Sequence, residues 1–407
     1  MPMRPPASPR RRSAAALAAA LLLAAPAARA QAGGEAGEEA SRPWYERLSL
    51  RGYAQVRYNR LLETNPELVC AQCDRSIGGD GGFFVRRARL VVSGDVHPRV
   101  SVYIQPDLAT ALDGEQHGLQ MRDLYADVFL DSGRTLRVRV GQSKVPWGFE
   151  NLQSSSNRVP FDRDDAINSG MPNERDLGLV AMWAPGAARR RFRTLADSGL
   201  KGTGDYGVVA VAVMNGQSGN QSEANGNKHV VARLAYPFRL GNGQFVELGV
   251  QGYHGRFVLL DRSGGVAGPD ELTDERVAGS LVVYPQPIGL QAEWTTGKGP
   301  AYDAAANAVA SRTLRGGYVQ TMARVRWAGQ QLIPYARLQS YDGGKKHELD
   351  ARLHRVREFE IGAEWLPIPA LELTAAWATS HRRTADGANA GYDETGQLLR
   401  LQAQFNY

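Results

Sequence analysis

Apolar and polar residues alternate along most of the chain after residue 47. In the run 135–142, for example, leucine and valine residues alternate with Arg137 and Arg139. Because successive side chains of a β-strand point to opposite faces, such a run predicts a strand with one apolar and one polar face. Sixteen runs of this kind follow one another as far as 399–407. Each is near the ~10 residues that a tilted membrane-spanning strand needs.

The connections between the runs differ in length in a regular way. Odd-numbered connections are long and polar, at 60–82, 109–118, 143–175, 216–228, 254–275, 298–312, 342–355 and 380–396. Even-numbered ones are mostly tight turns, at 96–98, 132–133, 237–243, 285–289, 328–331 and 367–370. An arginine-rich insertion at 184–205 departs from this rule. Long loops on one side and short turns on the other are typical of an outer-membrane barrel.

These patterns together predict an all-β protein. We expect residues 48–407 to form a transmembrane antiparallel β-barrel of about 16 strands, because a closed barrel leaves no unpaired strand edge in lipid. The last strand ends on the aromatic Tyr407. A soluble β-sandwich that binds carbohydrate is a further interpretation, which the regular alternation of loop lengths disfavours.

The third long connection, at about 143–175, is the most distinctive. It is too polar and broken to be another strand, and it carries Arg158, Arg163 and Arg175 beside several acidic residues. We expect this loop to fold into the lumen of the barrel and to narrow it.

Residues 1–30 have the features of a cleaved export signal. A basic start is followed by an Ala/Leu run at 14–25 and by the small-residue site Ala28-Arg29-Ala30. Residues 31–47 are expected to be a flexible lead-in. The full chain has a net charge of +6, and residues 1–30 hold five arginines and no acid, which leaves about +1 for the remainder. Net charge therefore gives no reason to expect a nucleic-acid partner.

The two cysteines, Cys70 and Cys73, lie in one predicted loop. Beyond the inner membrane the environment is oxidising, so a local disulfide is the favoured interpretation. A metal site would need further ligands nearby, and a redox motif would need a βαβ unit; the sequence has neither at this point. The histidines are scattered, and there is no Gly-x-Ser-x-Gly motif. We therefore expect no enzyme activity, no cofactor and no metal.

Several stretches resemble the phosphate-selective porin O and P family. They are FFVRRARLVVSG at 83–94, RDLYAD at 122–127, RVGQSKVPWGFE at 139–150, NERDLGL at 173–179, QAEW at 291–294 and YDGGKKHE at 341–348. The resemblance covers essentially the whole chain after the export signal. It implies a trimeric barrel of sixteen strands in the outer membrane of a Gram-negative cell. It also implies a third loop that constricts the pore and basic residues that line an anion path.

Basic residues on the polar faces of the strands are the candidates for that path. They are Arg51, Arg57, Arg87, Arg89, Arg137, Arg139, Lys144, Arg324, Arg326 and Arg337. Each such charge would replace part of the hydration that an anion such as phosphate or polyphosphate loses in the pore. Acidic residues are expected on the same faces, so a pore without selectivity stays open as an alternative. A plugged barrel with a structural or surface-interaction role is the other interpretation, and lipid and lipopolysaccharide are the expected surroundings.

Overall fold

The computed structural model describes residues 43–68, 70, 81–112, 115–388 and 391–407. The predicted export signal at 1–30 and the lead-in as far as residue 42 lie outside the described residues. Residues Trp44–Tyr407 form one compact unit. Among the described residues, no helix is long and apolar enough to cross a membrane.

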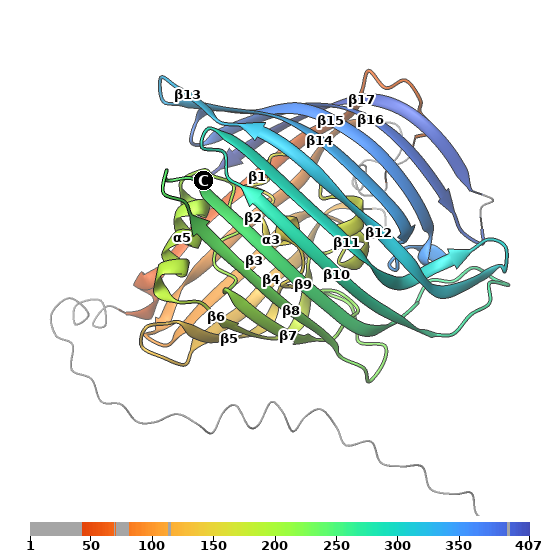
Figure 1. The fold of residues 1–407 in the computed structure, drawn as a ribbon, viewed down its shortest axis with the longest axis horizontal. Helices are drawn as coiled ribbons and strands as arrows, with labels where there is room; N and C mark the ends of the chain where they lie inside the picture. The colour runs from red at the N-terminus through yellow and green to blue at the C-terminus, as the bar shows by residue number, and fades with distance from the viewer. Residues whose placement is uncertain (1–42, 69, 71–80, 113–114, 389–390) are drawn as a thin grey trace, which may run out of the picture. The chain divides into compact units, whose positions relative to one another are not determined.

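The unit is built mainly from strands (Figure 1). They are β1 (Leu48–Leu61), β2 (Gly82–His97), β3 (Val100–Leu112), β4 (Glu115–Phe129), β5 (Leu136–Lys144), β6 (Arg175–Trp183), β7 (Val209–Met214), β8 (His229–Arg239), β9 (Phe245–Val258), β10 (Glu271–Val283), β11 (Ile288–Asp303), β12 (Ala308–Ala323), β13 (Val325–Trp327), β14 (Gln330–Gly344), β15 (Leu353–Ile368), β16 (Leu371–Ala385) and β17 (Tyr392–Asn406). The helices are η1 (Trp44–Arg47), α3 (Phe149–Leu152), α4 (Asp165–Gly170), α5 (Gly186–Asp197) and η2 (Leu349–Ala351).

Each strand pairs antiparallel with its neighbours in the chain, and the sheet closes on itself. β12 and β13 both pair with β14 and are separated only by Arg324, so they act as one strand. The barrel closes where β1 pairs with β17, with Tyr53 opposite Asn406. The predicted barrel of sixteen antiparallel strands is therefore confirmed.

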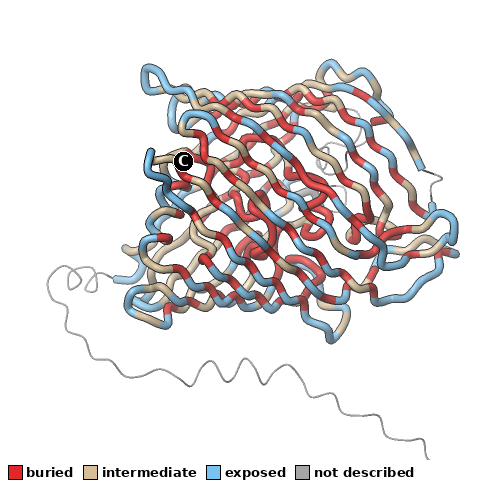
Figure 2. The backbone as a smooth tube through the Cα atoms, viewed as in Figure 1, coloured by how far each residue is buried: buried red, intermediate tan, exposed pale blue. Residues whose placement is uncertain are grey.

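Burial alternates along the strands, as Figure 2 shows. In β8, Val230 and Leu234 are 42% and 51% exposed, whereas Arg233, which points to the opposite face of the strand, is only 3% exposed. The apolar residues thus face outward and the polar residues face inward, which is the reverse of a soluble protein. This inversion rules out the soluble β-sandwich and fits a barrel whose outer face meets lipid.

Three of the predicted long loops are wrong. The connections expected at 109–118, 298–312 and 380–396 are largely strand, because the paired backbone ladder continues through them. The loop expected at 342–355 is present but shorter, since β14 ends at Gly344 and β15 begins at Leu353. β11 and β12, for example, stay in register as far as Asp303 opposite Ala308. A tilted membrane crossing needs only ~9–11 residues, and β11 has 16. The strand ends beyond the membrane need no apolar face, so alternation does not reveal them.

The antiparallel order sorts the connections between two ends of the barrel. The chain enters β1 and leaves β17 at the end that also carries the connections β2–β3, β4–β5 and β6–β7, which we call the turn end. The connections β1–β2, β3–β4 and β5–β6 lie at the opposite end, the loop end. In Figure 1 the turn end, with α5 and the C-terminus, is on the left.

The arginine-rich insertion between β6 and β7, residues 184–208, contains α5. Pro185 precedes the first helical residue, Gly186, as the N-cap, and its extended conformation is one that proline readily adopts. Ala188, Phe192 and Leu195 recur at helical spacing and are buried, while the arginines lie between them. Ala188 and Phe192 belong to a small apolar cluster at the turn end. The insertion is therefore a packed part of the barrel.

Candidate functional site

The connection between β5 and β6, residues 145–174, is called the β5–β6 segment. It begins and ends at the paired residues Lys144 and Arg175. Its side chains and backbone bond to strands far apart in the chain: β1 through Tyr53 and Arg57, β11 through Glu293 and β14 through Arg337. The segment is thus held by the polar faces of strands from different parts of the ring.

Both short helices of this segment are capped by carboxylates. Glu293 of β11 accepts hydrogen bonds from the backbone N–H groups of Phe149 and Glu150 at 2.5 and 2.8 Å, at the start of α3. Asp164 accepts one from Ile167 N at 2.9 Å, at the start of α4. A side-chain acceptor at this position satisfies backbone donors that a helix leaves unpaired. The sequence therefore forms helical turns here although neither run is long enough to be stable alone.

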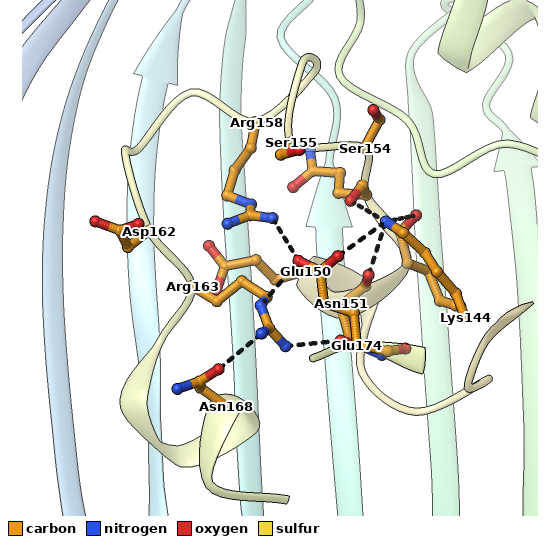
Figure 3. Close-up of polar contacts among 12 residues, drawn as sticks. Lys144, Glu150, Asn151, Ser154, Ser155, Arg158, Asp162, Arg163, Asn168 and Glu174 are labelled. Atoms are coloured by element: carbon orange, nitrogen blue, oxygen red, sulfur yellow. Dashed lines mark hydrogen bonds and ion pairs between the residues drawn. The ribbon is translucent and has the colours of Figure 1, made fainter. Parts of the chain in front are cut away.

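Glu174 is the centre of a buried charge cluster (Figure 3). Arg163 lies 3.1 Å and Arg158 lies 3.3 Å from its carboxylate, and Arg175 pairs with it as well. Burial alone would raise the pKa of Glu174, but the surrounding cations outweigh burial and hold that pKa well below its ordinary value. The carboxylate is therefore ionised and ties the middle of the segment to its C-terminal end.

Two further carboxylates join the segment to the barrel wall. Glu150 of α3 accepts two hydrogen bonds from the guanidinium of Arg337, at 2.6 and 3.0 Å. Asp165 of α4 pairs with Lys345 at 2.5 Å and with Arg382 at 3.1 Å. In both carboxyl groups burial acts to raise the pKa, and the neighbouring cations lower it by more. These bidentate and paired contacts fix the segment in one position.

A cavity of about 420 Å³ lies at the loop-end side of the segment. We call it the arginine cavity. Its basic side chains are Arg86, Arg87, Arg89, Arg122, Arg158, Arg163 and Lys346. Its acidic side chains are Asp107, Asp162, Glu174, Asp261 and Glu348, so cations exceed acids by seven to five. A lining of this sign concentrates anions in a water-filled site.

Two of these guanidinium groups differ from the rest. Arg87 donates to Gln55 Oε1 at 2.7 Å, and Arg122 donates to Gln120 Oε1 and to Asn173 O. In the described part of the chain neither forms an ion pair, whereas Arg89, for example, pairs with Asp107 at 2.8 Å. Among the described residues, Arg87 and Arg122 are therefore the two guanidinium groups of the cavity with no carboxylate at ion-pair distance.

A second cavity, of about 590 Å³, lies toward the turn end. Arg51, Lys144 and Arg175 are its basic lining residues. The ammonium group of Lys144 donates to the backbone carbonyls of Asn151, Leu152 and Gln153. Its charge is thus used to hold the β5–β6 segment.

The structure separates the sequence-predicted residues into groups. Arg87, Arg89, Arg158 and Arg163 meet in the arginine cavity, and Arg51, Lys144 and Arg175 line the second cavity. The other candidates line neither cavity and are held elsewhere: Arg57 by Asp162, Arg137 by Asp205, Arg139 by Asp127, Arg337 by Glu150, and Arg324 and Arg326 by the Ser198 carbonyl.

Three basic residues of the arginine cavity were missed. In a regular strand, Arg86 and Arg87 would point to opposite faces. The β1–β2 register shifts at this point, with Gln55 opposite Arg87 and Val56 opposite Val85. Such a bulge adds one residue and re-aims its side chain, which alternation does not predict. Arg122 and Lys346 lie within the motifs at 122–127 and 341–348 that carry the family resemblance, which was their available signal.

The structure describes only one of the two cysteines of the predicted disulfide. Cys70 is disulfide-bonded. Cys73 lies outside the described residues, so the pairing stays a prediction. No group of three or more His, Cys, Asp or Glu side chains that would hold a metal occurs among the residues that the structure describes.

A closed barrel with an apolar outer face, a polar inner face and a basic cavity has the architecture of an outer-membrane channel. The chain belongs to the family of phosphate-selective porins O and P, whose model matches residues 71–262 and 260–407. The predicted family is thus confirmed. No curated protein sequence matches the chain.

Solved structures of other outer-membrane proteins share the fold. The outer-membrane channel DcaP of Acinetobacter baumannii has 14% identity and a TM-score of 0.51, with 88% of this chain and 97% of that chain covered. The trimer form of OmpT from Vibrio cholerae has 9% identity and a TM-score of 0.54, with 89% and 100% covered. OmpF of Salmonella typhi has 12% identity and a TM-score of 0.52, with 88% and 97% covered. At these identities the likeness concerns the fold alone.

Proposed function

We propose that this channel admits small hydrophilic anions such as phosphate or polyphosphate by passive diffusion. The observation that carries the proposal is the arginine cavity, in which Arg87 and Arg122 have no carboxylate partner among the described residues. An anion that enters a narrow pore loses hydration, and fixed guanidinium groups replace it. Cations gain nothing from the same groups.

The β5–β6 segment is proposed to fold into the lumen and to form the constriction. Its ion pairs with Arg337 and Arg382, on different strands, support a position across the barrel. In outer-membrane barrels the long loops face the exterior and the short turns face the periplasm. A solute from outside would therefore meet the arginine cavity before it reaches the second cavity. The apolar outer face would contact lipid and lipopolysaccharide, after cleavage of the export signal at 1–30.

Removing the two unneutralised charges is expected to reduce anion preference. In the double variant R87Q/R122Q, glutamine keeps hydrogen-bonding capacity but not charge. A unit charge about 5 Å from the path favours an anion, and disfavours a cation, by about 0.8 kcal/mol in a water-like dielectric, so the loss of two should lower the anion-to-cation permeability ratio by at least about tenfold. The measurement is the reversal potential of the purified protein in a planar bilayer under a salt gradient, with and without phosphate.

The matched control is Arg355→Gln, which removes an exposed arginine paired with Asp342 outside both cavities. It should leave the reversal potential unchanged. An unchanged potential in R87Q/R122Q as well would remove the arginine cavity from the conduction path. A plugged barrel with a surface role, the alternative suggested by the many contacts of the β5–β6 segment, predicts no conductance steps at all.

A homotrimer is proposed as the assembly. The support is the family and the solved trimer form of OmpT. Chemical cross-linking of the protein in detergent is expected to give a ladder that ends at three subunits. A ladder that ends at one subunit would contradict the proposal without affecting the pore of a single barrel.

A further inference from the structure

Tyrosine side chains make up a large part of the lining of the second cavity. We call it the tyrosine chamber, and its tyrosines are Tyr53, Tyr103, Tyr125, Tyr206 and Tyr407. They come from β1, β3, β4, the insertion at 184–208 and the C-terminal residue. None of the described residues that line the arginine cavity is a tyrosine. A solute that moves from one cavity to the other therefore passes from a charged environment into an aromatic one.

The tyrosines form an ordered surface. Tyr103 and Tyr125 face each other across the β3–β4 pair, and their rings stack with centroids 5.1 Å apart and planes 6° apart. The guanidinium of Arg139 covers Tyr125 at 3.8 Å from the ring centroid, while Arg51 lies 5.8 Å from the centroid of Tyr103. Tyr125 is thus enclosed between two neighbours. Tyr103 is only loosely covered on its side of the stack and is half-buried.

The cations of the chamber are not equally available. Lys144 is held by three backbone carbonyls, and Arg175 pairs with Asp123 at 2.8 Å. Arg51 is exposed and forms no ion pair within the described part of the chain. A guanidinium without a carboxylate partner, beside a tyrosine ring that it covers only loosely, suits a solute with one anionic group and one ring.

We propose that the tyrosine chamber is a solute-binding subsite that retains anions with an aromatic ring more strongly than inorganic phosphate. This inference rests on the proposed anion channel. The anionic group of the solute pairs with Arg51, and its ring packs against Tyr103 and Tyr206. Ring-to-ring contact adds free energy that inorganic phosphate lacks, because phosphate meets a single guanidinium there.

The test compares two probes on the same channel. Phenyl phosphate and inorganic phosphate are added to purified protein in a planar bilayer, and the concentration that halves the chloride current is measured for each. Phenyl phosphate is expected to be effective at about tenfold lower concentration. Equal half-blocking concentrations, or no block by either probe, would overturn the inference.

Variants separate the ring contact from the charge. Tyr103→Leu and Tyr206→Leu are expected to abolish the advantage of phenyl phosphate and to leave block by inorganic phosphate unchanged. Arg51→Gln should weaken phenyl phosphate without removing the ring contact. The control is Tyr58→Leu, a tyrosine of β1 on the face opposite Tyr53 and outside the chamber lining. An advantage that survives in both tyrosine variants also overturns the inference.

The reversal potential, recorded in the same bilayers, distinguishes the two levels of the argument. Anion preference without an advantage for phenyl phosphate leaves the proposed function intact and refutes the subsite. Absence of anion preference refutes the proposed function itself. Folding of each variant is checked by the heat-dependent shift of the barrel on gel electrophoresis.

Discussion

Replacing Glu150 with glutamine is expected to destabilise the barrel by about 3–5 kcal/mol, because Arg337 then remains buried without an ionised partner. Glu150 is fully buried, and the two hydrogen bonds from Arg337 join α3 to β14. Glutamine preserves the shape, and its single oxygen can still accept from Asp164 N, but the change removes both the charge and one of the two acceptors that face Arg337. Unfolding by guanidinium chloride in detergent, followed by tryptophan fluorescence, gives the free energy.

The matched control is Glu271→Gln. Glu271 pairs with Arg256 at 3.3 Å, but both side chains are largely exposed. Exposed pairs of this kind contribute about 0–1 kcal/mol, so the control should unfold close to the unaltered protein. Equal losses in the two variants would show that the α3 contact with β14 does not hold the β5–β6 segment.

The effect of Glu150 should also depend on pH. Burial would raise the pKa of Glu150, but Arg337 lowers it by more, to below its ordinary value of 4.5. A carboxyl group with a lowered folded-state pKa stabilises the fold above its unfolded pKa, and this contribution is lost as the pH falls through the folded-state value. The difference in unfolding free energy between the protein and Glu150→Gln is therefore expected to be full at neutral pH and to shrink below pH 4.5.

The sequence was sufficient to predict the barrel because lipid imposes a strict rule on every strand. Each crossing must present apolar residues to one side, as Val230 and Leu234 do in β8, and period-two alternation records this directly. Beyond the membrane the rule no longer applies. The ends of β11 and β12 are held as strands by backbone pairing alone. Their side chains need not alternate there, and residues 298–312 therefore resemble a loop in sequence.

The site was less predictable because charge pairing depends on which strands meet. Alternation predicted that Arg57, Arg139 and Arg337 lie on the polar faces of their strands, and all three are buried in the structure. Nothing in their local sequence distinguishes them from Arg87, which has no carboxylate partner in the described residues. The partner of Arg337, for example, is Glu150, which is remote in sequence and belongs to the β5–β6 segment. Alternation assigns a face, but only the closed barrel assigns a partner.

Replacing Lys201 with methionine is expected to release the insertion at 184–208 from the barrel wall and to raise single-channel conductance. Lys201 lies 2.5 Å from Glu364 of β15, and both side chains are buried. The backbone carbonyl of Lys201 accepts a hydrogen bond from Gln153, and that of Gly202 accepts one from Asn157 at 2.7 Å. The insertion therefore supports the β5–β6 segment from the turn end.

Apolar contacts reinforce this connection between the two segments. Phe149 of α3 packs in one buried cluster with Leu195 and Leu200 of the insertion. In Lys201→Met, Glu364 remains buried without its cation, which should cost about 3–5 kcal/mol. Movement of the insertion away from β15 would expose the Glu364 carboxylate to water and so remove this cost. The β5–β6 segment would then lose the support of the insertion. Larger current steps with more noise are the expected record in planar bilayers.

Two further variants decide whether the charge pair itself is responsible. Lys228→Met removes a lysine whose pair with Glu223 is exposed, so it should change neither stability nor conductance. The double variant K201M/E364M replaces both charges with apolar side chains of similar length, and such replacement of a buried pair is often neutral or stabilising. It should restore much of the stability and the original conductance, since Glu364 is no longer there to draw the insertion outward. If K201M alone leaves the conductance unchanged while it lowers stability, the insertion does not limit the pore.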